Sequence, residues 1–99
     1  MTPPAPPPPE TFVSVDVETS GPTPAQYSLL SIGACLVDDP ARTFYVELRP
    51  IGPAATDEAM VIHGLDLERL QREGAEPAEA MARFEAWLRA ELPAGALPD

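Results

Sequence analysis

The sequence predicts a small α/β domain in which three strands form an antiparallel sheet and are followed by short helices and one long packing helix. Two patterns carry this prediction. Apolar and polar residues alternate along three runs in the first half of the chain, and apolar residues recur at helical spacing in the second half. With 99 residues, 44% of them hydrophobic, the chain has room for one core and for no second domain.

The first predicted strand covers residues 11–18 and has two unlike faces. One face carries Val13, Val15 and Val17, and the other carries Phe12, Ser14, Asp16 and Glu18. Two further β-rich runs predict strands over 28–38 and 42–49, joined by a turn at Asp38–Pro40. Because the links between the runs are short, we expect consecutive strands to pair antiparallel.

Helical signals follow Pro53. Thr56 is a favourable N-cap, and Gly64 can adopt the left-handed conformation that ends a helix, so a short helix is predicted between them. A second short helix is predicted over 66–72, before Gly74.

The longest helix is predicted over 77–92, with Pro77 in its first turn and Pro93 preventing continuation. Its apolar stripe consists of Met81, Phe84, Leu88 and Leu92. We expect this stripe to cover the valine face of the first strand, and we expect Phe84 and Trp87 to be core residues rather than a base-stacking platform.

The domain is predicted to occupy residues 11–92, between a disordered Pro-rich head (1–10) and a flexible tail (93–99). The head is interpreted as a solvated polyproline segment, with a ligand for an SH3-type groove as the alternative. No run is apolar enough for a membrane span, and a cytoplasmic protein with no membrane partner is expected. The sequence assigns no oligomeric state.

The charge balance excludes one common class of function. Sixteen acidic residues against six basic ones give a formal net charge of −10. A passive basic nucleic-acid binder is excluded, because phosphate backbones are held by Lys and Arg. Cys35 is the single cysteine, so no internal disulfide can form, and we interpret it as a small hydrophobic residue rather than a nucleophile.

Asp16 and Glu18 are the residues most suggestive of chemistry. At positions i and i+2 of a strand they project from one face, with backbones roughly 6.5 to 7 Å apart. If that face is desolvated, the mutual repulsion of the carboxylates needs a cation, and hard divalent ions prefer carboxylate ligands. Two alternatives stay open. One is a solvated sheet face without a ligand, and the other is a two-carboxylate glycosidase site, which nothing else in the chain supports.

Four segments in order resemble the DnaQ-like, DEDD-type 3′–5′ exonuclease family. Phe12–Pro22 (FVSVDVETSGP) is similar to its first motif, and Leu29–Ala34, Phe44–Pro50 and Ile62–Leu65 are similar to its second strand, third strand and helix-ending turn. The resemblance covers about residues 11–92. It implies the N-terminal part of a ribonuclease H-like fold and hydrolysis of terminal phosphodiesters at the 3′ ends of single-stranded DNA or RNA.

The resemblance also implies roles for particular residues. Asp16 and Glu18 would be catalytic and would hold two divalent ions, Mg²⁺ or Mn²⁺, while Thr19 would approach the terminal nucleotide. His63 is expected to be a capping or exposed residue, since the general base of the family comes from its third motif.

The second and third acidic motifs of the family do not occur in this sequence. Asp99 follows Pro98 without the expected surroundings, so it is not assigned to the second motif. We therefore expect a truncated family member that is inactive alone. The alternative is a non-catalytic partial domain that acts as a protein-interaction module through its sheet edge or its Pro-rich head.

Overall fold

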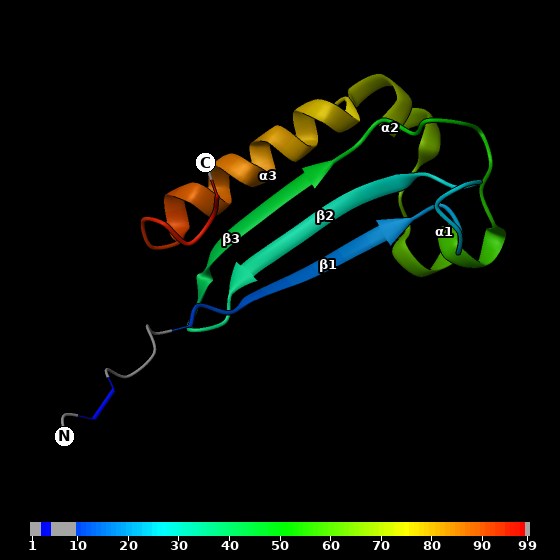
Figure 1. The fold of residues 1–99 in the computed structure, drawn as a ribbon. Coiled ribbons are helices and arrows are strands. Elements are labelled where there is room, and N and C mark those ends of the chain that lie inside the picture. The colour runs from blue at the N-terminus through cyan, green and yellow to red at the C-terminus, as the bar shows by residue number, and fades with distance from the viewer. Residues whose placement is uncertain (1–2, 5–9, 99) are drawn as a thin grey trace.

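The computed structural model describes residues 3–4 and 10–98. Its elements are the strands β1 (Val13–Thr19), β2 (Leu29–Leu36) and β3 (Asp39–Glu47), followed by the helices α1 (Asp57–His63), α2 (Leu67–Glu73) and α3 (Pro77–Glu91). The strands form one antiparallel sheet in the order β1-β2-β3, with α3 along β3 and the two short helices at one end of the sheet (Figure 1). The predicted three-stranded antiparallel sheet and its succession of helices are confirmed.

The helix ends follow local sequence signals. Thr56 caps α1 by accepting a hydrogen bond from the Ala59 amide at 3.2 Å, and Gly64 ends the helix with φ 68°. Asp66 caps α2 through hydrogen bonds from the amides of Glu68 and Arg69. Pro77 opens α3, as expected of a residue that lacks an amide donor.

The hydrophobic core lies between α3 and strands β2 and β3. Its buried members are Ile32, Val46, Leu48, Ala75 and Ala80, with Leu29, Phe44 and Phe84 packed against them. The rings of Phe44, Phe84 and Trp87 form an aromatic cluster with centroids 5.3 to 6.4 Å apart. Phe84 is half-buried and packs against the core as predicted, whereas Trp87, also half-buried, contacts the rings of this cluster at the margin of the core.

The expected position of α3 over the valines of β1 is wrong. Val15 and Val17 are 51% and 47% exposed, because α3 follows β3 at the opposite edge of the sheet from β1 (Figure 1). The cause lies just before the helix, where Ala75 bridges Leu48 in parallel fashion: the Ala75 amide donates to Glu47 O, and the Arg49 amide donates to Ala75 O. This bridge starts α3 beside the end of β3.

The predicted turn at Asp38–Pro40 is also displaced. The turn consists of Val37 and Asp38, and β3 already begins at Asp39. Pro40 is tolerated because β3 is an edge strand and because the ladder is irregular there, passing from the pair Leu36–Asp39 to the pair Cys35–Thr43.

The structure describes only part of the head and tail that were predicted to flank the domain. Most of the predicted Pro-rich head, residues 1–2 and 5–9, lies outside the described residues, as does Asp99. Residues 93–98 contain a turn in which the Ala96 amide donates to Pro93 O at 3.1 Å. Within the described part of the chain, no helix combines the length and apolar character needed to cross a membrane.

Candidate active site

Asp16 and Glu18 project from the face of the sheet opposite the core. The register places Asp16 beside Gly33 of β2, and Gly33 beside Tyr45 of β3. The next row runs from Glu18 through Ser31 to Glu47. These two rows make an acidic face, which we define by Asp16, Glu18, Ser31, Gly33, Tyr45 and Glu47.

The acidic face borders a hollow of about 440 Å³. Its lining residues are Asp16, Glu18, Ser31, Gly33, Tyr45, Ile62, His63 and Leu65. Residues from the end of α1 and the turn after it therefore line the same hollow as the two carboxylates of β1, a neighbourhood that the sequence did not predict. Thr19 does not line this hollow; it lines another, of about 420 Å³, beside the 21–28 loop.

The carboxylates of Asp16 and Glu18 are less buried than the argument for a bound cation assumed, because that argument took their face of the sheet to be desolvated. Asp16 is exposed and Glu18 is half-buried, so water solvates both carboxylates in part. Desolvation therefore does not by itself require a bound cation, and the interpretation of the pair as a solvated sheet face is not excluded.

His63 connects the end of α1 to the end of β1. Its Nδ1 accepts a hydrogen bond from the Leu65 amide at 3.0 Å. Because Nδ1 is the acceptor, Nε2 carries the proton and donates to Thr19 O at 3.1 Å. Both ring nitrogens are engaged with backbone groups, so His63 is a positioning residue and not a free base, in line with the capping role expected from the sequence.

A chain of polar contacts crosses from the acidic face to α2. Tyr45 Oη donates to Glu47 Oε2 at 3.0 Å, and Arg69 donates to both oxygens of Glu47, each at 3.0 Å. The Arg69 guanidinium lowers the pKa of the Glu47 carboxyl and has its own pKa raised in return. Partial burial, together with the hydrogen bond to Glu47, raises the pKa of Tyr45. Sequence reasoning missed this network, because it depends on a contact between residues 22 positions apart.

The donor set only partly suits two divalent ions. Carboxylate oxygens are the ligands that Mg²⁺ and Mn²⁺ prefer. Within residues 3–4 and 10–98, however, no group of three or more His, Cys, Asp or Glu residues gathers closely enough to hold a metal. The two acids would therefore supply only some of the ligands of a two-ion centre, and the other described residues supply none beside them.

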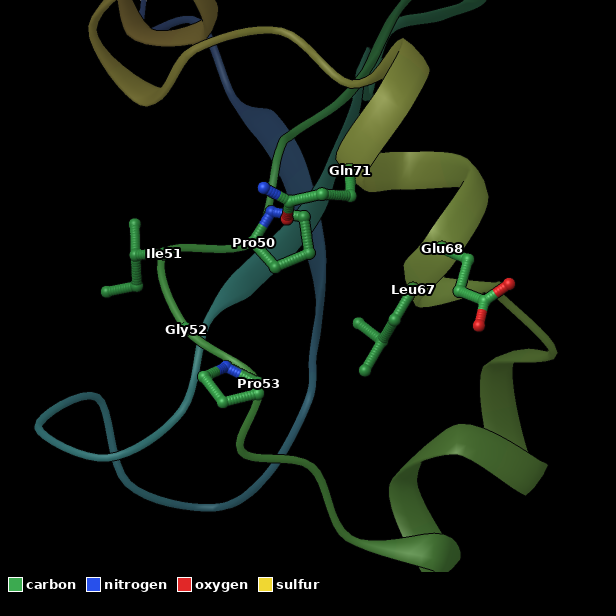
Figure 2. Close-up of a pocket in the computed structure, with 7 residues that line it drawn as sticks. All are labelled: Pro50, Ile51, Gly52, Pro53, Leu67, Glu68 and Gln71. Atoms are coloured by element: carbon green, nitrogen blue, oxygen red, sulfur yellow. The ribbon is translucent and has the colours of Figure 1, made fainter.

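A third hollow, of about 420 Å³, lies between the 50–53 segment and α2. Figure 2 shows Leu67 directed toward Pro53 and the carboxylate of Glu68 turned away. Its lining offers Glu68 as the single ionisable side chain. This hollow therefore lacks the paired acids found at the acidic face.

A comparison with known proteins shows which kind of protein this chain is similar to. The chain is 49% identical over 79 residues to a protein of Escherichia coli named 3′-5′ DNA exonuclease Cap18. The alignment covers 80% of this chain and 42% of that relative, so the chain spans about two fifths of its relative's length. No protein-family model matches. Identity at this level over most of the chain reflects common ancestry, and the resemblance to a 3′–5′ exonuclease family that the motifs carry is confirmed.

Proposed function

We propose that this chain contributes the first acidic strand to a metal-dependent 3′–5′ exonuclease that removes nucleotides from single-stranded DNA or RNA. The observation that carries the proposal is the placement of Asp16 and Glu18 side by side at a hollow closed by the end of α1. The name of the relative supports 3′–5′ polarity and, for that protein, a DNA substrate.

In this proposal Asp16 and Glu18 bind divalent ions together with acids from elsewhere in a complete enzyme. The ions would activate water and neutralise the phosphate oxygens, which an acidic chain cannot do by itself. The His63 bond to Thr19 O would keep the end of β1, and with it the backbone next to Glu18, in a fixed position. Thr19 would approach the terminal nucleotide from the neighbouring hollow beside the 21–28 loop, because it does not line the hollow of Asp16 and Glu18.

Ligand count sets the expected behaviour of the isolated chain. Each ion of a two-metal centre needs ligands from more than one segment, and Asp16 and Glu18 come from one strand. Alone, the chain should degrade a 5′-labelled oligonucleotide no faster than background with Mn²⁺. In a longer version with further acidic motifs, Asp16→Ala should lower the rate at least about 10³-fold, as loss of a preorganised electrostatic group does.

The same oligonucleotide degradation assay can also contradict the proposal. EDTA should abolish the activity of the longer version. Degradation by its Asp16→Ala variant at the parental rate would show that the assignment of Asp16 is wrong. Thr43→Ala is a suitable control, because Thr43 is an exposed residue of β3 that does not line the hollow.

A second candidate function, docking of another polypeptide, is favoured by the outer side of β1. Among the described residues, β1 pairs only with β2, and Val15 and Val17 are about half exposed beside its free edge. An unpaired strand edge with apolar neighbours is a template for strand addition. We propose that the occupant is a polypeptide equivalent to the part of the relative that this chain does not match.

Mixing this chain with the proposed polypeptide partner tests this second function. This chain and that polypeptide, prepared separately, should form a complex in sedimentation and acquire Mn²⁺-dependent activity. Val15→Glu with Val17→Glu should abolish both, whereas Val61→Glu, at an 82% exposed valine of α1, should leave both unchanged. Failure of the unsubstituted chains to associate would refute docking at β1.

A further inference from the structure

Tyr45 presents an aromatic face in the same row of the sheet as Asp16. Gly33 is the register partner of both residues, so the three form a line across the sheet. Since Gly33 has no side chain, nothing on β2 stands between the phenol and the carboxylate. With strands 4.7 to 4.9 Å apart, the backbones of Asp16 and Tyr45 are separated by roughly 10 Å.

The phenol is both accessible and held in place. Tyr45 is 61% exposed, yet its hydroxyl is bound by Glu47, which Arg69 grips through two hydrogen bonds. Arg69 is bound in turn to Glu73 of its own helix. An aromatic face fixed before a ligand arrives loses less conformational entropy on binding than a mobile one.

The arginines of this chain offer little for phosphate binding. Five of the six form ion pairs, and they are Arg42, Arg49, Arg69, Arg83 and Arg89. Arg72 is the one arginine without an ion pair within the described residues. With a net charge of −10, the side chains themselves do not attract nucleic acid electrostatically, so affinity beyond what bound ions would supply needs another source.

We propose that Tyr45 is the platform on which the base at the 3′ end of the nucleic acid stacks, while the adjoining phosphate faces the divalent ions that Asp16 and Glu18 would help to hold. The proposal rests on the function proposed above and deepens it by naming how the terminal nucleotide is held. Every base has a π face, so such a platform gives affinity with little base preference. The hollow of about 440 Å³ that Tyr45 and Asp16 share lies within the size range of small-ligand sites.

The test compares how tightly the chain binds an oligonucleotide with a 3′-terminal base and one without that base. The probes are two 5′-fluorescein-labelled single-stranded DNA hexamers, one with a 3′-terminal thymidine and one with a 3′-terminal abasic nucleotide. Their affinities for the 99-residue chain are measured by fluorescence anisotropy with Mg²⁺ and again with EDTA. Tyr45→Leu should weaken binding of the thymidine hexamer about 5- to 100-fold and leave the abasic hexamer unchanged.

Two variants separate stacking from other effects. Tyr45→Phe keeps the ring and loses the hydroxyl held by Glu47, so its loss of affinity should be smaller than that of Tyr45→Leu. Phe12→Leu removes another exposed aromatic, 59% accessible, which does not line the hollow, and should change neither affinity. Circular dichroism should show all three variants folded, since both rings are largely in solvent.

The outcomes separate this proposal from the one on which it rests. Equal losses for both hexamers, no loss for Tyr45→Leu, or no measurable binding of the thymidine hexamer up to millimolar chain would each overturn the platform. Suppose that Tyr45→Leu weakens binding of the thymidine hexamer only, and that the Asp16→Ala variant of the longer version is fully active. This pair of results would support the platform and refute the metal-site assignment.

Discussion

At the scale of single residues, Gly74 lies against backbone atoms that leave no room for a side chain. A Cβ at this position would lie 2.5 Å from the Arg49 nitrogen and the Leu48 carbonyl carbon, and 2.6 Å from Leu70 O. All three are backbone atoms, which cannot turn aside as a flexible side chain can. Gly74 therefore allows the segment before α3 to lie against the end of β3.

Gly74→Ala should destabilise the protein by about 1 to 3 kcal/mol, the usual range for overpacking, or by more if the Leu48–Ala75 bridge separates. Gly52→Ala is the matched control, because a Cβ there meets nothing within 4 Å. Urea denaturation of both variants checks the prediction. Equal stabilities would mean that the contact between the two segments is looser than described.

His63→Ala should separate a positioning role from a catalytic one. Loss of two hydrogen bonds to backbone groups should lower the free energy of unfolding by about 1 to 2 kcal/mol. In a longer, active version the rate should change less than about tenfold, because loss of a general base usually costs 10²-fold or more. Thermal melts and oligonucleotide turnover give the two measurements; a rate loss above 10²-fold with unchanged stability would make His63 a catalytic residue.

At the scale of elements, the ion pair of Glu47 with Arg69 fastens α2 to β3. The pKa of Glu47 is lowered in the folded protein from its usual value of 4.5. A carboxyl with a lowered folded pKa contributes stability above its unfolded pKa, and that contribution is lost as the pH falls through the folded pKa.

Glu47→Gln should therefore lower the melting temperature at pH 7. The difference from the parent should shrink as the pH falls below 4.5 and through the lowered pKa of Glu47. Glu85→Gln, which removes an exposed pair within α3, should change little at any pH. A constant difference between parent and Glu47→Gln from pH 7 to pH 3 would contradict the role given to this pair.

The elements also show what the sequence can and cannot reveal. Alternation located the three strands, and the signals at Thr56, Gly64 and Pro77 located the helix ends, because these features depend on neighbouring residues. The strand covered by α3 could not be predicted. The apolar stripe of a helix shows that it covers something, whereas the Ala75 bridge decides what it covers.

The candidate site likewise has a part that the sequence predicts and a part that it does not. The shared face of Asp16 and Glu18 follows from strand periodicity alone. The neighbourhood of Tyr45 and Gly33 depends on register, which shifts between Glu18 and Thr19 and again between Cys35 and Leu36. The Glu47–Arg69 contact joins β3 to α2 and has no local signature.

At the scale of the whole molecule, the number of acids should limit metal affinity. Two carboxylates from one strand provide few ligands of fixed geometry. Calorimetry should detect millimolar or no binding of Mg²⁺ and Mn²⁺ to the isolated chain. Asp16→Asn with Glu18→Gln should abolish whatever binding is present, and micromolar affinity in the parent would mean that further ligands exist.

Within residues 3–4 and 10–98, no strand pairs with the outer edge of β1, and this has a consequence for behaviour at high concentration. A strand with alternating valines and an unpaired edge is the type of segment that nucleates intermolecular β-structure, and Asp16 and Glu18 place two negative charges on it. Those charges repel the same strand of a neighbouring molecule, so the residues proposed to bind metal also act as gatekeepers against aggregation. Asp16→Asn with Glu18→Gln should therefore increase thioflavin T-positive assembly, whereas Asp57→Asn with Glu58→Gln, the same change of charge on α1, should not.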